Sequence, residues 1–411
     1  MVTSVYACSA IIAGAVLPRI EHRLLPDLVS PVSVSAAMAI YSSIASGMIA
    51  LTGIVFSLTF VMVQFSATAY SPRLVLWFSR DPLLAHAFGT FTATFLYAIA
   101  ALAWLDRAGA PARVPLISAL TVVALLVASI AMFVGLINSI AKLQISRTLA
   151  FTGDEGRRVI DAIYPAWSSG APLQPAAPAG TPGQVVVRHG PPAAVTAVDV
   201  RRLVELASAA DAVVEILVAA GDTVTESTPL ARVHGARGPI DERRLLRTIG
   251  LGVERTFEQD PKYAIRLLVD IAIRALSPAV NDPTTAVQAL DQIGDLLLRL
   301  GRRRFEIGAA CDRSGAVRVL MPYPCWEDLL RLAFGEIASY GAASLQVMRR
   351  MHALVADLTS SVPLERRGAL ARWHVRLRQS VFANLVDQEQ RAAALVEDPQ
   401  GLGIPRRGSG A

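Results

Sequence analysis

Charged side chains recur through an otherwise apolar segment between residues 255 and 291, and they are the groups of this chain best suited to bind a ligand or an ion. Arg266, Asp270 and Arg274 stand four residues apart, so a helix would place the carboxylate between two guanidinium groups on one face. Because the apolar spacing implies burial, we expect these charges to be paired. The set comprises the charged residues Arg255, Glu258, Asp260, Arg266, Asp270, Arg274, Asp282 and Asp291 together with the amide Asn281.

Two interpretations of this segment stay open. It forms a structural ion network that fixes helix order and subunit register, or it forms a ligand or ion site near the turn 277–285. In the second case Asn281, Asp282 and Thr284 supply the donors and acceptors. The candidate residues for these two roles are Arg255, Asp270, Arg274, Asn281, Asp282 and Thr284.

The familiar enzyme motifs are absent from the sequence. It has no phosphate-binding glycine loop ending in Lys-Ser or Lys-Thr, no His-Glu-x-x-His pair and no Gly-x-Ser-x-Gly turn. The 6 histidines are scattered singly, and Cys8, Cys311 and Cys325 make neither a disulfide framework nor a zinc pattern. We therefore name no catalytic residue, metal or cofactor, and we leave enzymatic activity as a third alternative.

The elements before this segment are membrane helices. The stretches 28–72, 82–105 and 114–141 carry no charged residue, and each exceeds the roughly 20 apolar residues that a spanning helix needs. A fourth uncharged run, 1–18, is short, but it lacks the basic start and the small-residue cleavage site of a signal peptide. We predict a membrane domain over 1–146, with spans at about 1–18, 32–66, 83–105 and 114–141.

The second span is too long for one crossing. A continuous helix over 31–72 would reach about 60 Å, roughly twice the hydrocarbon thickness, so it either projects from the membrane or breaks near Gly47 or Gly53. Small and polar residues recur along it at helical spacing, whereas Thr52, Thr59 and Ser66 repeat on what we take to be an adjacent face. That stripe either permits close helix packing or lines a water-filled path between subunits. The pore-lining candidates are Ser46, Gly53, Ser57 and Gln64.

Few other polar groups lie at membrane depth. We expect His86 at the membrane interface and Asn138 in a hydrogen bond between helices. No carboxylate or arginine falls inside a predicted span, which disfavours a proton relay or a voltage sensor. With the C-terminal part inside, six basic residues flank the spans on the inner side against four on the outer side. This asymmetry predicts a cytoplasmic C-terminal part.

The remaining residues, about 265, hold 32 of the 39 basic and 29 of the 33 acidic side chains, a net charge too balanced for a nucleic-acid surface. A Pro/Gly/Ala-rich linker ends the connector 147–183. Short strand signals then predict a small β-barrel or sandwich module over 184–238, and a mainly helical domain follows over 239–400. In that domain Asp282 and Pro283 suit a helix start, and we predict two long helices, 326–361 and 364–396. The tail 401–411 is expected to be disordered.

Several runs of residues resemble a known bacterial family. In the soluble part they are Arg255-Thr256-Phe257-Glu258-Gln259-Asp260, Arg274-Ala275-Leu276-Ser277-Pro278 and Asn281-Asp282-Pro283-Thr284-Thr285-Ala286; in the membrane part they are Val55-Phe56-Ser57-Leu58-Thr59-Phe60 with Gln64 and the exit Tyr70-Ser71-Pro72-Arg73. The chain resembles the family known as domain of unknown function 2254 over nearly its whole length. That resemblance implies an N-terminal membrane region followed by a soluble domain, and it carries no established activity.

The predicted fold class is therefore a membrane α-helical bundle of about four helices, followed by a cytoplasmic α+β region with a small β module and a helical C-terminal part. We expect a multi-pass protein of the bacterial inner membrane that forms a homo-oligomeric channel or passive transport pathway with a cytoplasmic regulatory domain. The alternative is a membrane-anchored ligand sensor or scaffold without transport. Its expected partners are the lipid bilayer, further copies of the chain and a small ion or metabolite, but not nucleic acid.

Overall fold

The computed structural model describes residues 2–25, 28, 30–69, 82–107, 113–141, 145–167, 182–399 and 401. The chain forms two compact units, Met1–Gln144 and Ile145–Ala411. We call them the membrane unit and the C-terminal unit. The exit 70–73 of the second span, most of the Pro/Gly/Ala-rich linker and nearly all of the tail predicted to be disordered lie outside the described residues.

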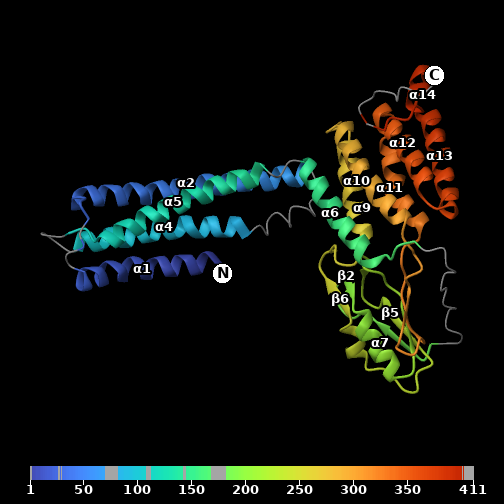
Figure 1. Cartoon of the computed structure of the whole chain (residues 1–411), viewed down its shortest axis with the longest axis horizontal. Coiled ribbons are helices and arrows are strands. Elements are labelled where there is room, and N and C mark those ends of the chain that lie inside the picture. Colours follow the sequence, from blue (N-terminus) through green and yellow to red (C-terminus); the bar gives the residue numbers. More distant parts are fainter. Residues whose placement is uncertain are drawn as a thin grey trace. The chain divides into compact units, whose positions relative to one another are not determined.

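Four helices make up the described part of the membrane unit (Figure 1), and each is long and apolar enough to cross a bilayer. This confirms the predicted bundle. The helices are α1 (Val2–Leu24), α2 (Val34–Ala69), α4 (Pro82–Arg107) and α5 (Leu116–Ala141). In α2 the helix runs unbroken for 36 residues, about 54 Å at 1.5 Å per residue. The break considered at Gly47 or Gly53 therefore does not occur.

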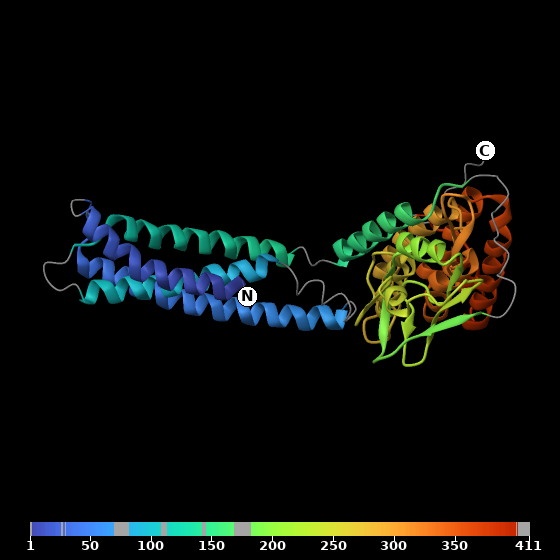
Figure 2. The ribbon, with the colours of Figure 1, turned by 90° about the horizontal axis from the view of Figure 1, so that it is seen from below.

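Helix α4 is the centre of the membrane unit, because α1, α2 and α5 all pack against it (Figure 2). Glycine allows the closest of these approaches. A Cβ added at Gly14 of α1 would lie 2.7 Å from the Cβ of Ala100 on α4, and one at Gly89 of α4 would lie 2.9 Å from the ring of Tyr6. Close backbone packing of this kind is how helices associate in lipid.

Polar side chains of α4 also join it to its neighbours. His86 Nδ1 lies 3.2 Å from the Tyr6 hydroxyl of α1, and the Thr94 hydroxyl lies 2.8 Å from that of Ser129 on α5. By contrast, Asn138 is exposed on α5 within the single chain. The predicted partner of Asn138 on another helix is therefore not found among the described residues.

Helix α1 extends beyond its predicted end at residue 18, because Pro18 lies inside the helix. The extra turns bring Glu21 to the start of α5, where the carboxylate is only 2% exposed. Its two oxygens accept hydrogen bonds from the backbone N–H of Ile117 (2.6 Å) and of Ser118 (2.9 Å). First-turn amides have no partner within their own helix, so Glu21 caps α5 from a distant part of the chain. The longer α1 therefore also contains Arg19, Glu21 and Arg23, all of which follow the predicted end of the first span at residue 18.

Two open sheets build the β part of the C-terminal unit. One has the strand order β1-β5-β3-β8-β7 and the other β4-β2-β6. All strand pairs are antiparallel except β3 with β8, which is parallel. The strands are β1 (Gln184–Val187), β2 (Ala193–Val198), β3 (Val213–Ile216), β4 (Thr223–Val224), β5 (Pro229–His234), β6 (Ile249–Gly252), β7 (Ala309–Cys311) and β8 (Val317–Leu320). The described strands close no barrel, and three of them lie after residue 238.

A shared apolar core holds these sheets together with α7 (Val200–Ala209) and α8 (Glu242–Leu246). Each short helix starts at an aspartate. The side chain of Asp199, which caps α7, accepts from the N–H of Arg202 at 3.0 Å, and Asp241 accepts from the N–H of Arg243 at 2.9 Å. Side-chain oxygens at this position satisfy amides that the helix leaves without partners.

The helical part of the C-terminal unit packs α10 against α6, α9 and α12, and α11 and α13 complete it (Figure 1). Asp282 caps α10 with Pro283 at its first position, as predicted. Pro261 starts α9, so residues 255–260 of the charged segment precede the helix. The helices are α6 (Ile145–Ile163), α9 (Pro261–Ala275), α10 (Pro283–Gly301), α11 (Trp326–Tyr340), α12 (Leu345–Ser361), α13 (Leu364–Asn384) and α14 (Gln388–Ala394).

The two long C-terminal helices of the prediction are four helices in the structure. The first breaks after Gly341, and the Ser344 hydroxyl begins α12 by accepting from the N–H of Val347. The second breaks before Asp387, whose carboxylate accepts from the N–H of Gln390 at 2.8 Å. Apolar periodicity continues through both breaks, which is why the pattern alone merges the helices.

Arg366 of α13 holds the end of α10. Its side chain is 6% exposed, and its guanidinium donates to the backbone carbonyls of Leu300 (2.9 Å), Gly301 (2.7 Å) and Arg303. Leu300 and Gly301 belong to the last turn of α10, whose carbonyls attract positive charge, and Arg303 follows directly after the C-cap of the helix. Burial lowers the pKa of Arg366 to about 10, so it stays protonated at neutral pH.

Aromatic rings enclose the same guanidinium. Its central carbon lies 4.4 Å from the ring centre of Phe305, 4.7 Å from that of Trp167 and 5.7 Å from that of Trp326. Desolvated cation–π contacts of this kind each contribute up to about 2 kcal/mol. Arg366 thereby joins α10, α11 and α13.

We predict that Arg366→Lys lowers the free energy of unfolding by about 3 kcal/mol, because an ammonium cannot make the three hydrogen bonds that the planar guanidinium makes. The control is Arg378→Lys, an exposed arginine of the same helix, which should change it by less than about 0.5 kcal/mol. Denaturant unfolding of the full chain in detergent measures both values. Equal effects of the two substitutions would contradict the structural role of Arg366.

Candidate functional site

Two places in the structure combine polar groups with unusual surroundings: the outer face of α2 and a buried aspartate in the C-terminal unit. On α2, one face packs inside the membrane unit and carries the buried residues Ala37, Tyr41, Ile44, Ala45, Met48 and Val55. The pore-lining candidates Ser46, Gly53, Ser57 and Gln64 are all exposed within the single chain. At 3.6 residues per turn they lie on the opposite side of the helix.

Large apolar side chains border this outer stripe. Phe56 and Phe60 lie on one side of it and Ile54 on the other, each more than half exposed. A Cβ added at Gly53 would meet no atom of the described chain within 4 Å. The stripe is therefore a row of small and polar side chains between larger apolar side chains, and it leaves space for another helix or for water.

Thr52 and Thr59 are half-buried and turn toward the packed side of α2, not onto a face next to the stripe. Their hydroxyls donate to the carbonyls one turn back, Met48 and Val55, each at 2.7 Å. Such bonds satisfy a hydroxyl in lipid without any second helix. This separates the threonines from the exposed residues of the stripe.

In the C-terminal unit, the ion pairs of α9 extend to a neighbouring helix. Arg266 donates both to Asp270 on its own helix and to Glu336 on α11. The Glu336 carboxylate thereby has its pKa lowered, chiefly by its hydrogen bond with Arg266. Arg266, Asp270 and Glu336 thus tie α9 to α11. Arg274 is half-buried one turn further along α9.

The turn 277–285 brings three candidate residues together at the start of α10. Asn281 adopts the left-handed conformation with a φ of 48°. The Asp282 carboxylate accepts from the N–H of Thr285 (3.1 Å) and from its hydroxyl (2.6 Å), while Thr284 is exposed. Both oxygens of Asp282 therefore already accept hydrogen bonds at the helix start, so a ligand at this turn would share the carboxylate with the cap.

Asp260, the N-cap of α9 and six residues before Arg266, is the most unusual group of the segment. It is 1% exposed. Its Oδ1 accepts from the N–H of Lys262 at 3.0 Å, but its Oδ2 has no hydrogen-bond partner among the described residues. Leaving a buried carboxylate oxygen unpaired costs free energy. Burial accordingly raises the pKa of Asp260 to about 6, even though Lys262 and Arg255 act in the opposite direction.

A small cavity of about 20 Å³ lies beside Asp260, enough for one water molecule. Gly221 packs against the unpaired oxygen of Asp260: a Cβ there would lie 1.8 Å from Asp260 Oδ2, so only glycine fits. The cavity is lined by Val198, Val218, Ala219, Ala220, Gln259, Asp260, Pro261, Lys262, Met321, Pro322, Tyr323 and Pro324. Strands of the β part and the start of α9 therefore meet at this point.

A second unpaired group stands near the same carboxylate. Tyr164 follows directly after α6 and is 1% exposed, and its hydroxyl has no partner among the described residues. Burial raises the pKa of Tyr164, and Tyr323 and Asp260 raise it further. Asp260, Tyr164 and the cavity form what we call the Asp260 site. Its chemistry suits a water, a small polar ligand or a titrating proton.

Asp260 belongs to the charged segment 255–291 but is not one of the site candidates predicted from the sequence. Its position before Pro261 indicates a helix cap. Its burial depends on the Gly221 turn, about 40 residues earlier in the sequence, which no local pattern reveals. Among the described residues, no group of three or more His, Cys, Asp or Glu side chains is placed to hold a metal ion.

Four membrane-length helices followed by an α+β unit define an integral membrane protein. The chain belongs to the family described as "Predicted membrane protein", domain of unknown function 2254, which matches residues 1–357. It is similar to uncharacterized proteins of Mycobacterium tuberculosis and Mycobacterium bovis, each 29% identical over 96% of this chain and 80% of the relative. No solved structure matches.

The titration of Asp260 predicts a pH dependence. A folded pKa of about 6, raised from 3.8, makes the contribution of Asp260 most favourable below pH 3.8, and that contribution is lost as pH rises through 6. The loss is roughly 3 kcal/mol between these limits. In Asp260→Asn the cap is kept and the titration is removed. We expect wild type to lose stability relative to this variant between about pH 4 and about pH 7, measured by thermal unfolding; parallel profiles would contradict the assignment.

Proposed function

We propose that the protein is a homo-oligomeric channel or passive transport pathway, in which the outer face of α2 lines a path between subunits. The observation that supports this proposal is the exposed stripe of Ser46, Gly53, Ser57 and Gln64. Lipid favours apolar side chains on exposed helix faces, and polar residues in membrane helices normally face a bundle interior or water. Further copies of α2 would give this stripe such an environment.

The stripe also has the form that helix association requires. Small residues let neighbouring backbones approach, and the flanking Phe56 and Ile54 would fill the spaces beside the contact. With these ridges packed between subunits, the serine hydroxyls and Gln64 would face a shared axis. A passive pathway suits the absence of an ionisable residue in the stripe itself.

The C-terminal unit would act as a cytoplasmic regulatory domain in the bacterial inner membrane. Arg147, Arg157 and Arg158 follow soon after α5, and basic residues after a span favour the inner side. In the sequence, α6 begins just after α5 and ends immediately before Tyr164 of the Asp260 site. A change at that site would therefore act on the helix that follows the membrane unit.

The Asp260 site also supports a second candidate function, that of a membrane-anchored ligand sensor or scaffold without transport. A buried carboxylate with one unpaired oxygen beside a cavity is a binding feature that needs no pore. A thermal-shift screen with nucleotides and small metabolites tests it. A compound that stabilises wild type but not Asp260→Asn, in a protein without flux, would favour the sensor.

We predict that purified protein in liposomes conducts ions or small solutes. Gly53→Leu should reduce this flux about tenfold or more, because raising the free-energy barrier to passage by about 1.4 kcal/mol slows passage tenfold. The added side chain meets no atom of its own chain within 4 Å, so a loss of flux reports on the path or on other subunits. Fluorescent-dye or ion-electrode assays on liposomes provide the measurement.

The matched control is Gly47→Leu, the same change at a second glycine with nothing within 4 Å. Six residues separate the two glycines, which places them about a third of a turn apart on α2. This variant should keep most of the flux. No flux from wild type with any ion or at any pH, or equal losses in the two variants, would count against the proposed pathway.

A further inference from the structure

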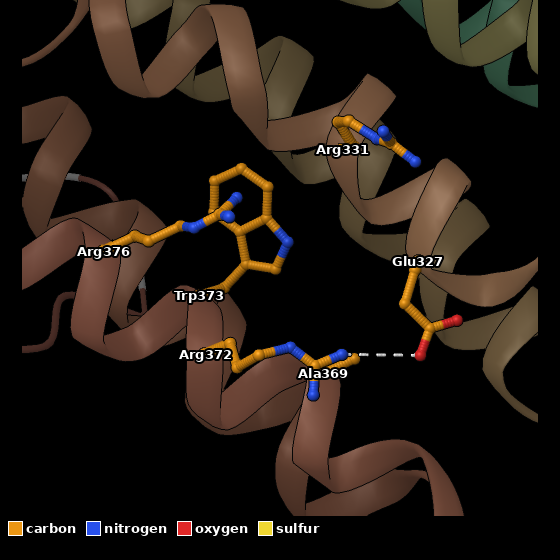
Figure 3. Close-up of a pocket in the computed structure, with 6 residues that line it drawn as sticks. All are labelled: Glu327, Arg331, Ala369, Arg372, Trp373 and Arg376. Carbon is orange, nitrogen blue, oxygen red and sulfur yellow. Dashed lines mark ion pairs between the residues drawn. The ribbon is translucent and has the colours of Figure 1, made fainter.

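A cavity of about 160 Å³ lies between α11 and α13 in the C-terminal unit, apart from the Asp260 site. Figure 3 shows its lining: Trp373 at the centre, with the side chains of three arginines and one glutamate around it. The lining residues are Glu327, Arg331, Ala369, Arg372, Trp373 and Arg376. Three positive charges therefore face one negative charge across a small volume.

Trp373 gives the cavity a fixed floor. It is 8% exposed, and its ring packs edge-on against Phe334 of α11, with the ring centres 5.5 Å apart. The guanidinium of Arg376 lies 5.2 Å from the centre of the Trp373 ring. This contact orients Arg376 and occupies one face of the ring. A ligand would therefore meet charged groups before it could stack on the tryptophan.

The arginines differ in how fully their charges are matched. Arg331 pairs with Asp328 one turn away on α11. Arg372 lies 3.6 Å from Glu327, which is too long for a good hydrogen bond, and Figure 3 shows this pair at the edge of the group. Among the described residues, no carboxylate lies within ion-pairing distance of Arg376. Two guanidinium groups thus keep donors available for an anion.

We propose that this cavity binds a phosphate-bearing anion, with Arg372 and Arg376 as its principal ligands. The planar guanidinium presents paired N–H donors that match the oxygens of a phosphate group. Arg372 and Arg376 lie one helical turn apart on α13, so both can reach the same group. Glu327 competes for Arg372 and leaves Arg376 as the one lining arginine without a nearby carboxylate among the described residues.

The phosphate has two possible sources, a soluble phosphate metabolite or a lipid headgroup. Calorimetric titration of the full chain in neutral detergent with pyrophosphate tests the first source. Titration with phosphatidylcholine bicelles, with and without phosphatidic acid, tests the second. Saturable heat in either arm is the expected result. Neither titration requires transport. A lack of anion binding would therefore contradict this proposal without bearing on the proposed channel, and a lack of flux would do the reverse.

Substitutions decide whether the heat comes from this cavity. Arg372→Gln and Arg376→Gln should each weaken binding by about tenfold or more, since each removes a charge-assisted hydrogen bond. Glu327→Gln should tighten it by about threefold, because a competing carboxylate is removed. The matched control, Arg378→Gln, changes an exposed arginine of the same helix that does not line the cavity, and should stay within about twofold of wild type.

Each outcome decides the proposal. Binding of pyrophosphate that is lost in Arg376→Gln supports it with a soluble ligand, and binding only to phosphatidic acid, lost in the same variant, supports it with a headgroup. Absence of binding in both arms overturns it. Equal losses in Arg376→Gln and Arg378→Gln also overturn it, because the heat would then reflect the general positive charge of α13.

Discussion

Hydrocarbon imposes the constraint on which the membrane unit depends: every polar backbone group within the bilayer must find a partner inside the protein. Within a helix this is automatic, but the first amides of each helix remain unpaired. In α5, two of these amides donate to the carboxylate of Glu21, which α1 places there because it continues past Pro18. The same demand explains why Thr52 and Thr59 bond to their own helix, and it makes the polar outer stripe of α2 the feature that needs an explanation.

The C-terminal unit shows both ways of burying a charge. Arg366 has three carbonyls and three aromatic rings around it, and so it strengthens the contact of α10 with its neighbours. Asp260 keeps one oxygen without a partner beside a cavity, and burial raises its pKa into the physiological range. The first arrangement stabilises the fold, whereas the second leaves free energy that a ligand or a proton can recover.

Local patterns predicted the parts of this structure whose physics is local. Uncharged runs located the four membrane helices, and the pairing of Asp282 with Pro283 located the start of α10. Prediction failed where distant residues decide the outcome. No spacing indicates that Glu21 serves α5 or that Gly221 buries Asp260, and the parallel pairing of β3 with β8 joins segments about 100 residues apart. The break at Gly341 was missed because apolar periodicity continues across it.

In the proposed pathway α2 of one copy faces α2 of another across the stripe, and disulfide formation in membranes tests this contact most directly. Cys8, Cys311 and Cys325 are first replaced by serine, since all three are exposed. Gly53→Cys on this background should then form an oxidised dimer in high yield. Ile44→Cys, on the buried face of α2, should stay monomeric. Dimers from Ile44→Cys but none from Gly53→Cys would contradict the claim.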